Sequence, residues 1–270
     1  MLKPLQRTLF ALAAGALAAT VAHAKPLCTI VADAATGHVL VRQGECATRV
    51  TSASTFKVAI SLMGYDAGFL KDEHTPTLPY RDGYPDWGGA AWREPTDPAR
   101  WMRISIFWYS QQVAQALGQA RFQQYTTAFG YGNADVTSNE GELNGVMGAC
   151  ANGSLQISPL EQIDFMRKIV NRTLPVGAHA YDMTTRLMRL DAQPGGWTVH
   201  GKTGTGSPGA QYDAAHAYGW FVGWATKGPR TLVFANLIQD DKPQRPNAGM
   251  RSRDAFLDAL PALADSAQPR

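Results

Sequence analysis

The pattern of apolar residues changes along the chain, and five segments have the pattern of β-strands: three alternate, and two are apolar, β-rich runs. Residues 29–32 and 38–41 alternate around a polar turn, which predicts a hairpin. A second hairpin is expected where Lys227 to Arg230 separate two apolar, β-rich runs. The strand segments are 29–32, 38–41, 197–205, 218–224 and 231–238. Together they can form one antiparallel sheet.

The middle of the chain has the period of helices. Residues 58–63 are apolar on nearly all sides, which indicates a helix buried inside the protein rather than one on its surface. Residues 101–129 predict two helices separated by Gly118, and residues 158–170 predict a helix behind a Ser-Pro-Leu-Glu capping signature. An amphipathic helix is expected at 253–263.

These elements predict a mixed α/β fold of the α+β kind, with a central antiparallel sheet flanked by helices and a mainly helical lobe. We expect a single catalytic domain over residues 25–270. Its α/β lobe would comprise about 25–53 and 180–270, and its helical lobe about 54–179. Residues 72–97, rich in Pro, Gly, Trp and charge, predict a long surface connection.

The N-terminus has the pattern of a cleaved signal peptide at residues 1–24. Two positive charges precede an apolar run of small residues, and Ala22-His23-Ala24 supplies the small-x-small cleavage site. Cleavage there leaves 246 residues, enough for one large domain. Neither the leader nor any later segment has the ~20 apolar residues of a stable membrane helix. We therefore expect an exported, periplasmic protein without a membrane segment in its mature form.

Charge and histidine spacing argue against two classes of ligand. Removing Lys3 and Arg7 with the leader takes the formal net charge from +3 to +1, and no basic run is interleaved with aromatic residues. Nucleic acid is therefore not an expected partner. The six histidines lack metal-ligand spacing and the three cysteines form no Cys-x-x-Cys motif, so we expect no metal.

Export permits a disulfide bond, and three cysteines leave one thiol over. Cys28 and Cys46 bracket the first predicted hairpin, so their positions would be neighbours. We favour a Cys28–Cys46 bond with Cys150 free. Because connectivity cannot be read from a sequence, a pairing with Cys150 stays open.

The candidate chemistry begins at Ser54 and Lys57. Their spacing of three puts a hydroxyl and an amine on one face of a helix, one turn apart. The apolar residues that follow disfavour an ammonium ion, so Lys57 should be largely neutral near pH 7, as a base for a serine must be. By itself, however, Ser-x-x-Lys is a weak signal.

A second motif, Lys202-Thr203-Gly204, lies on an alternating segment in the last third of the chain. Glycine permits the close approach of another group to the backbone, while the lysine adds a positive charge and the threonine a hydroxyl. This composition suits a strand that binds a carboxylate.

The order of the motifs resembles that of the serine β-lactamases and penicillin-binding proteins. The chain lacks the Ser-Asp-Asn triplet of class A enzymes and has Tyr131-Gly132-Asn133 instead, 77 residues after Ser54. From about Cys28 to the C-terminal helix it resembles the class D, oxacillinase-type, serine β-lactamases. The Ser-x-Val motif of that family corresponds to Ser105-Ile106-Phe107, with Ser110 as a rival placement.

The resemblance implies that Ser54 attacks a β-lactam carbonyl and that water then hydrolyses the acyl-enzyme. Ser105 would relay the proton to the leaving nitrogen, and the backbone N–H groups of Ser54 and Thr205 would bind the oxyanion. Lys202, Thr203 and Arg251 would hold the carboxylate of the substrate. The other residues that the resemblance implies for the site are Gly204, Tyr131, Asn133 and Phe107.

By the same resemblance, Lys57 reacts with carbon dioxide and becomes a carbamate that acts as general base. A neutral amine in an apolar pocket suits this reaction. Candidate pocket residues are Phe56, Phe107, Trp108 and Leu155. Class D enzymes usually carry a tryptophan in the loop before the Leu-x-Ile-Ser helix entry, but residues 148–158 contain none, and Cys150 occupies its place.

Three alternatives stay open. Glu140 lies in a Glu-x-x-Leu-Asn pattern in which class A enzymes hold their deacylating glutamate. A cell-wall transpeptidase or carboxypeptidase shares both lysine motifs and would be acylated by penicillin and then stall. A non-enzymatic sensor domain would bind β-lactam covalently and signal, normally with the help of membrane segments.

Overall fold

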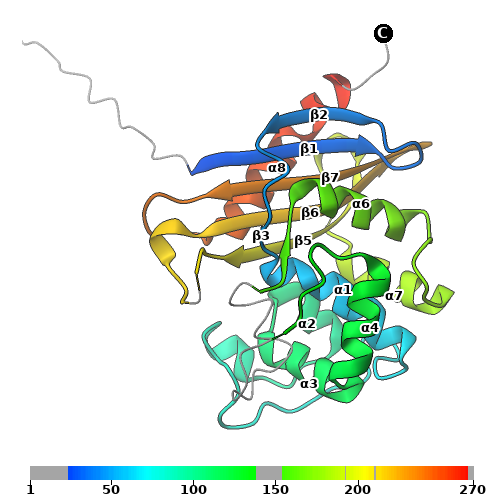
Figure 1. Cartoon of the computed structure of the whole chain (residues 1–270), viewed down its shortest axis with the longest axis vertical. Helices are drawn as coiled ribbons and strands as arrows, with labels where there is room; N and C mark the ends of the chain where they lie inside the picture. Colours follow the sequence, from blue (N-terminus) through cyan, green and yellow to red (C-terminus); the bar gives the residue numbers. More distant parts are fainter. Residues whose placement is uncertain (1–23, 138–153, 192, 210, 267–270) are drawn as a thin grey trace, which may run out of the picture.

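The computed structural model describes residues 24–137, 154–191, 193–209 and 211–266. Its central element is a five-stranded antiparallel sheet in the order β2-β1-β7-β6-β5 (Figure 1). The strands are β1 (Lys25–Asp33), β2 (Val39–Gly44), β5 (Thr198–Gly206), β6 (Tyr218–Lys227) and β7 (Arg230–Gln239). Each of the five predicted strand segments overlaps one of these strands, so the predicted central sheet is confirmed.

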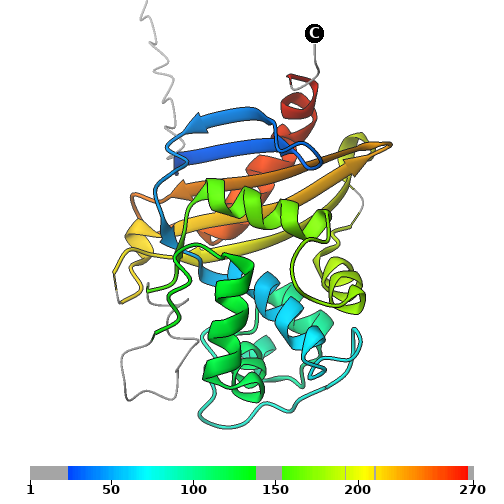
Figure 2. The same ribbon diagram turned by 45° about the vertical axis from the view of Figure 1, so that its right-hand side comes forward.

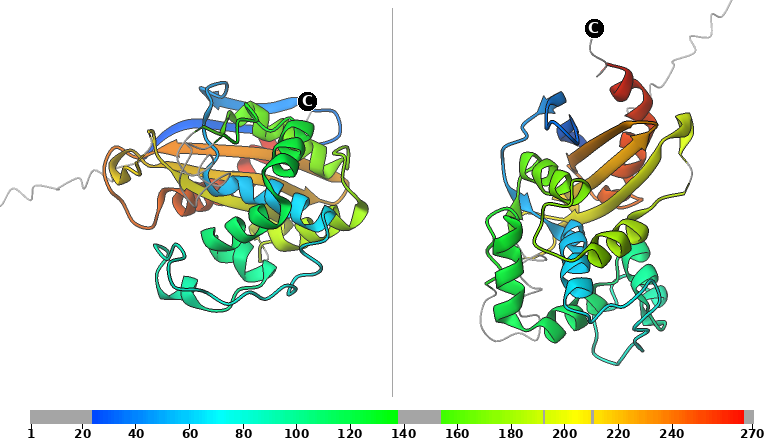
Figure 3. Two further views of the ribbon diagram at one scale, coloured as in Figure 1. Left: turned by 60° about the horizontal axis from the view of Figure 1, so that its bottom comes forward. Right: turned by 90° about the vertical axis from the view of Figure 1, so that its right-hand side faces the viewer.

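Both faces of the sheet are apolar, because successive side chains of a strand point to opposite sides. In β1, Ile30 and Ala32 belong to the larger core, whereas Val31 packs in a second core with Phe256 and Leu260. The last two residues lie on α8 (Ala248–Ser266), and α6 (Pro159–Val170) covers the opposite face (Figure 3, right). The sheet is thus the middle layer between two helices.

The remaining helices gather below the sheet in the view of Figure 1, and the rotated view of Figure 2 shows the same grouping. Helix α1 lies at their centre and packs against α3, α4 and α7. This is the buried helix that its apolar sequence predicts, since residues 57–65 are all buried. The helices of this group are α1 (Lys57–Asp66), α2 (Pro98–Ile104), α3 (Phe107–Leu117), α4 (Gln119–Phe129) and α7 (Ala178–Met188).

Local signals set several helix boundaries. Asp97 caps α2 by accepting a hydrogen bond from the backbone N–H of Arg100. Ser158 and Glu161 form the predicted capping box at the start of α6. Gly118, at φ 74°, separates α3 from α4 as expected. The long connection 72–97 contains the one-turn 3₁₀ helix η2 (Ala90–Arg93) and an isolated bridge between Leu78 and Thr96.

A second, two-stranded sheet joins distant parts of the chain just before Ser54. Strand β3 (Val50–Thr51) pairs with β4 (Gln156–Ile157), so that Val50 faces Ile157. The 3₁₀ helix η1 (Ala53–Phe56) follows β3, and α6 follows β4. The nucleophile candidate and the start of α6 are therefore held together.

The packing of two helices differs from the lobe boundaries expected from the sequence. Helix α6, counted there with the helical lobe of about 54–179, packs against strands β1, β6 and β7. Helix α7, divided there between the two lobes, packs against α1 and α2. Their amphipathic sequences show that each has one apolar face, but not which layer that face covers.

The disulfide between Cys28 and Cys46 is confirmed, and it joins β1 to the residues that follow β2. Cys150 lies outside the described residues, as do the predicted leader up to His23 and Glu140. Within the described ranges, no helix is long and apolar enough to cross a membrane.

Candidate active site

Ser54 and Lys57 meet at the junction of η1 and α1. Lys57 is the first residue of α1, and its Nζ donates a hydrogen bond to Ser54 Oγ over 3.1 Å. The lysine is only 2% exposed, whereas Ser54 is partly exposed. Ala53, directly before the serine, has a left-handed φ of 46°, a strained conformation for a residue with a Cβ. The turn therefore presents an accessible hydroxyl to a buried amine.

The amine of Lys57 lies beside an aromatic ring. Its Nζ lies 5.9 Å from the ring centroid of Phe107, and Phe56 and Leu155 are fully buried in the same core. Trp108, the other candidate for this pocket, donates its indole N–H to the backbone carbonyl of Trp92. Its indole N–H is thus bonded to the long connection 72–97.

Lys202 of β5 contacts Ser105 across the gap between the sheet and the helices. Its Nζ donates to Ser105 Oγ over 3.0 Å and to the carbonyl oxygen of Thr203 over 2.9 Å. Burial, and secondarily the charge of Lys57, hold the pKa of Lys202 well below its usual value. Each of the two neighbouring amines therefore has a serine hydroxyl within hydrogen-bond distance.

The position of Ser105 depends on the end of α2. Ser105 is the C-cap of that helix, with a left-handed φ of 61°. Its rival, Ser110, is fully buried in α3 and accepts a hydrogen bond from the indole of Trp101 over 2.8 Å. The structure thus brings Ser105 to Lys202, whereas Ser110 is bonded to Trp101.

Strand β5 lies against the nucleophile turn at its glycines. A Cβ atom added to Gly204 would lie 3.1 Å from the backbone nitrogen of Thr55 and 3.3 Å from that of Ser54. Such contacts are tighter than most real Cβ contacts, so glycine is what permits this approach. Since β5 is the last strand of the sheet, its outer edge borders this turn.

The hydroxyl of Thr205 is bound to the start of α8. It donates to Asn247 Oδ1 over 3.1 Å and accepts from the backbone N–H of Gly249 over 3.0 Å. Thr203 lies two residues earlier on the same face of β5 and is partly exposed. Asn247 was not expected from the sequence, because α8 begins at Ala248 rather than at the predicted residue 253.

Arg251 is held by a buried carboxylate. Its Nη2 donates to both oxygens of Asp240, over 2.6 and 2.5 Å, and its Nε donates to the carbonyl oxygen of Pro246 over 2.8 Å. The side chain of Asp240 is 2% exposed and that of Arg251 is 18% exposed. From the sequence we expected Arg251, Lys202 and Thr203 to bind the same substrate carboxylate. None of the contacts given above joins Arg251 to either of the other two residues.

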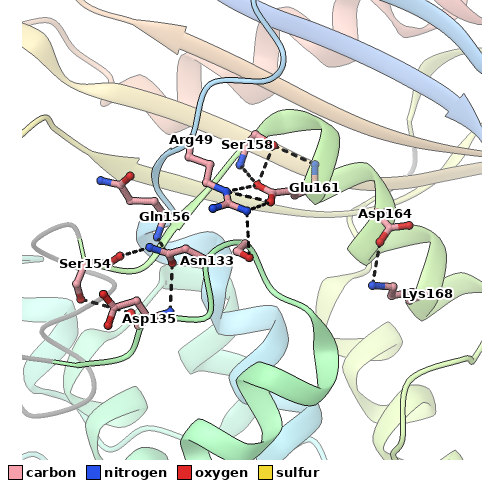
Figure 4. Close-up of polar contacts among 10 residues, drawn as sticks. Arg49, Asn133, Asp135, Ser154, Gln156, Ser158, Glu161, Asp164 and Lys168 are labelled. Carbon is pink, nitrogen blue, oxygen red and sulfur yellow. Dashed lines mark hydrogen bonds and ion pairs between the residues drawn. The ribbon is translucent and has the colours of Figure 1, made fainter.

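Tyr131 contacts the residue next to Ser54, whereas Asn133 is bonded to the segment before α6. Tyr131 is fully buried, and its hydroxyl lies 3.3 Å from both Thr55 Oγ1 and Gln162 Nε2. Asn133 donates to the carbonyl of Ser154 and accepts from the backbone N–H groups of Asp135 and Gln156 (Figure 4). These bonds connect the Tyr-Gly-Asn turn to the strand that precedes α6.

Comparison with known proteins agrees with this geometry. The family described as penicillin binding protein transpeptidase domain matches residues 27–261. β-Lactamase OXA-9 of Klebsiella pneumoniae is 40% identical over 240 residues, which cover 87% of each chain. The solved structure of the OXA-427 class D β-lactamase is 42% identical, with a TM-score of 0.82 over 89% of this chain and 99% of that one.

The chain belongs to the class D β-lactamases. β-Lactamase OXA-1 of Escherichia coli is a further relative, 34% identical over 87% of this chain and 84% of its own. This membership makes the chain a serine hydrolase of β-lactams, a class that needs no metal cofactor. Among the described residues, no group of three His, Cys, Asp or Glu side chains could hold a metal ion.

Proposed function

We propose that this β-lactamase works through an acyl-enzyme on Ser54, with Lys57 converted by carbon dioxide to a carbamate that acts as the general base. The observation that carries the proposal is the 3.1 Å contact between Ser54 Oγ and the buried Lys57 Nζ, which also lies beside the ring of Phe107. Carbon dioxide reacts with a neutral amine: a C–N bond forms and the amine releases a proton. Burial favours the neutral amine.

Charge balance near Lys202 supports a carbamate at this position. As an ammonium ion, Lys57 repels Lys202 and lowers its pKa. A carbamate replaces that repulsion by attraction, because its net charge is negative. Lys202 then retains its proton more easily and can keep donating to Ser105.

In the proposed reaction, Ser54 Oγ gives its proton to the base on Lys57 and attacks the lactam carbonyl. The backbone N–H groups of Ser54 and Thr205 bind the oxyanion, as the close approach of β5 to η1 supports. The ring C–N bond breaks, and Ser105 passes a proton to the leaving nitrogen. The same base then activates the water that hydrolyses the ester.

Lys202 and Thr203 are proposed to bind the carboxylate of the substrate, together with the guanidinium of Arg251. Asp240 fixes the orientation of this guanidinium, whose side chain is still 18% exposed. Phe107 would contact the body of the substrate, while Tyr131 and Asn133 shape the site from behind. A β-lactam antibiotic is thus the proposed small-molecule partner.

Export to the periplasm with cleavage after Ala24 is also proposed. In its support, β1 begins at Lys25, and that residue already pairs with Gln239 of β7. Residues 25–270 would then form the single catalytic domain. N-terminal sequencing of the protein from a periplasmic fraction should begin at Lys25, and an uncleaved N-terminus would contradict this part of the proposal.

The carbamate is tested by carbon-13 NMR of the protein supplied with labelled carbon dioxide. We expect one carbamate signal in the wild type and none in Lys57→Ala, with activity lost in the variant. Fully active enzyme without any carbamate signal would overturn the role proposed for Lys57.

A further inference from the structure

A buried polar cluster lies directly behind the nucleophile turn. Thr55, Tyr131 and Gln162 are all fully buried, although each carries a polar group. Gln162 Nε2 donates to Thr55 Oγ1 over 2.9 Å and lies 3.3 Å from the hydroxyl of Tyr131. Gln162 belongs to α6, so the cluster joins a helix that covers the sheet to the residue next to Ser54.

Thr55 controls the shape of the turn that carries Ser54. Its hydroxyl donates to the carbonyl oxygen of Ser52 over 2.6 Å, and its backbone N–H donates to the same oxygen over 3.2 Å. Its Cγ2 atom and backbone nitrogen lie against Gly204 of β5. The orientation of Thr55 therefore affects both the turn and its distance from the edge strand.

The backbone around Gln162 is held in place by several contacts, so its side chain can hold Thr55 in a fixed position. It directly follows Glu161, which completes the capping box with Ser158 and forms an ion pair with Arg49. Arg49 also contacts the carbonyl oxygen of Gly132, so it connects this helix start to the Tyr-Gly-Asn turn. These contacts fix the first turn of α6 and hence the origin of the Gln162 side chain.

The amide of Gln162 is only partly satisfied. Its Oε1 is buried and finds no hydrogen-bond partner within the described ranges. A buried amide oxygen without a partner lowers stability, and an apolar side chain of similar length would avoid this loss. The donor group, by contrast, is fully used by Thr55 and Tyr131.

We propose that Gln162 is a positioning residue for acylation. It donates to Thr55 and thereby holds the turn 52–56 so that the hydroxyl and the backbone N–H of Ser54 face an incoming carbonyl. The inference rests on the proposed function, in which Ser54 is the nucleophile. It adds a residue of α6 that never touches the substrate.

The test compares Gln162→Met, which removes the donor and keeps the length, with Thr184→Val as a matched control. Thr184 is also fully buried, and it shares a 2.8 Å hydrogen bond with Ser61 in α1, outside the cluster. We expect Gln162→Met to slow acylation by penicillin about tenfold or more, since small displacements of reacting groups cost rate steeply. Thr184→Val should acylate at the wild-type rate even though it also loses a buried hydrogen bond.

Gln162→Glu gives a second readout that a purely structural role would not produce. A protonated glutamic acid can donate to Thr55 Oγ1, whereas the ionised form can only accept. Burial raises the pKa of such a carboxyl. The acylation rate of Gln162→Glu, divided by that of the wild type at each pH, should therefore fall as the pH rises through the pKa of the new carboxyl.

Peptide mapping of the acylated protein separates the possible failures. If the adduct lies on a residue other than Ser54, the proposed function is wrong. If it lies on Ser54 but Gln162→Met acylates as fast as the wild type, the positioning role is wrong. If Gln162→Met does not fold, the pH dependence of Gln162→Glu decides, and a constant ratio overturns the proposal.

Discussion

Lys202 donates a hydrogen bond to Ser105, and this 3.0 Å contact joins the edge strand of the sheet to the end of α2. A second contact between the sheet and the helical side occurs where Gly204 of β5 lies against Thr55 of η1. The groups proposed for the site therefore come from both sides of one junction. The proposed catalytic residues Ser54, Lys57 and Ser105 lie on the helical side, and the proposed carboxylate-binding Lys202 lies on the sheet. Changes in the separation of the two sides should affect activity before they affect folding.

Replacement of Ser54 by alanine should abolish turnover, because Ser54 supplies the nucleophilic hydroxyl of the proposed mechanism. The fold should be kept, since the serine is partly exposed and its side chain does not cap η1. The measurement is the rate of penicillin hydrolysis beside a thermal melt. Residual turnover close to the wild-type rate would exclude Ser54 as the nucleophile.

Gly204→Ala should push β5 away from the nucleophile turn. The new methyl group would lie 3.1 Å from the backbone nitrogen of Thr55, so the strand or the turn must move by a few tenths of an ångström. We expect kcat/KM to fall by about 10²-fold, the scale of loss from small misplacement at a reacting centre. Thr198→Ala, at the exposed start of the same strand, serves as the control. Equal kinetics for the two variants would show that the close approach is not needed.

Arg251→Ala should destabilise the protein, because it leaves the carboxylate of Asp240 buried without its partner. Breaking a buried ion pair in this way costs about 3 kcal/mol. The double variant Arg251→Met, Asp240→Leu should recover part of that stability, since no charge stays buried. Urea unfolding of both variants measures the difference. If Arg251→Ala is as stable as the wild type, the pair is not a structural element.

His200 should weaken the fold at acidic pH. Its ring stacks on Trp224 with centroids 4.9 Å apart, and burial, with a smaller effect of Arg189, lowers its pKa from 6.5 to about 4. Between these values the unfolded chain binds a proton that the folded protein does not, so stability falls as the pH drops from 6.5 towards 4. His200→Phe should remove this part of the pH dependence, as urea titrations across the range will measure. An unchanged slope would contradict the assignment.

Activity should depend on added bicarbonate more than is usual for a class D enzyme. No tryptophan occurs in residues 148–158, and the indole of Trp108 is bonded to Trp92 instead. A less shielded carbamate on Lys57 is protonated and lost more easily, most clearly below neutral pH. Progress curves at acidic and neutral pH, with and without bicarbonate, measure the effect. Identical progress curves with and without bicarbonate would show that the carbamate on Lys57 is not less protected than in other class D enzymes.

Much of the fold could be predicted because its signals are local. Strand alternation, the capping box at Ser158 and the glycine at 118 each depend on a few neighbouring residues. The contact between Ser54 and Lys57 was also predictable from their spacing. It occurs although Ser54 lies in a 3₁₀ turn rather than an α-helix, because residues three apart are eclipsed in that geometry.

The rest depends on contacts between distant segments. Gln162 meets Thr55 from 107 positions away, and Lys202 meets Ser105 from 97 positions away. The resemblance favoured Ser105 over Ser110, but the contact with Lys202 itself is not a local feature. Ser105 reaches Lys202 because α2 ends at Ser105, next to β5. The bond between Arg251 and Asp240 was missed for the same reason, since it depends on how α8 lies on the sheet.

The central claim is that Ser54 is acylated by a β-lactam and then released by water. Its most direct test is a steady-state assay of the purified protein with a penicillin and a chromogenic cephalosporin, combined with peptide mapping of the adduct trapped by rapid acid quenching. We expect many turnovers per chain with at least one penicillin, no effect of a chelator, and an adduct on the peptide that contains Ser54. One stoichiometric acylation followed by a stall, as in a transpeptidase or a sensor domain, or an adduct on another residue, would contradict the account.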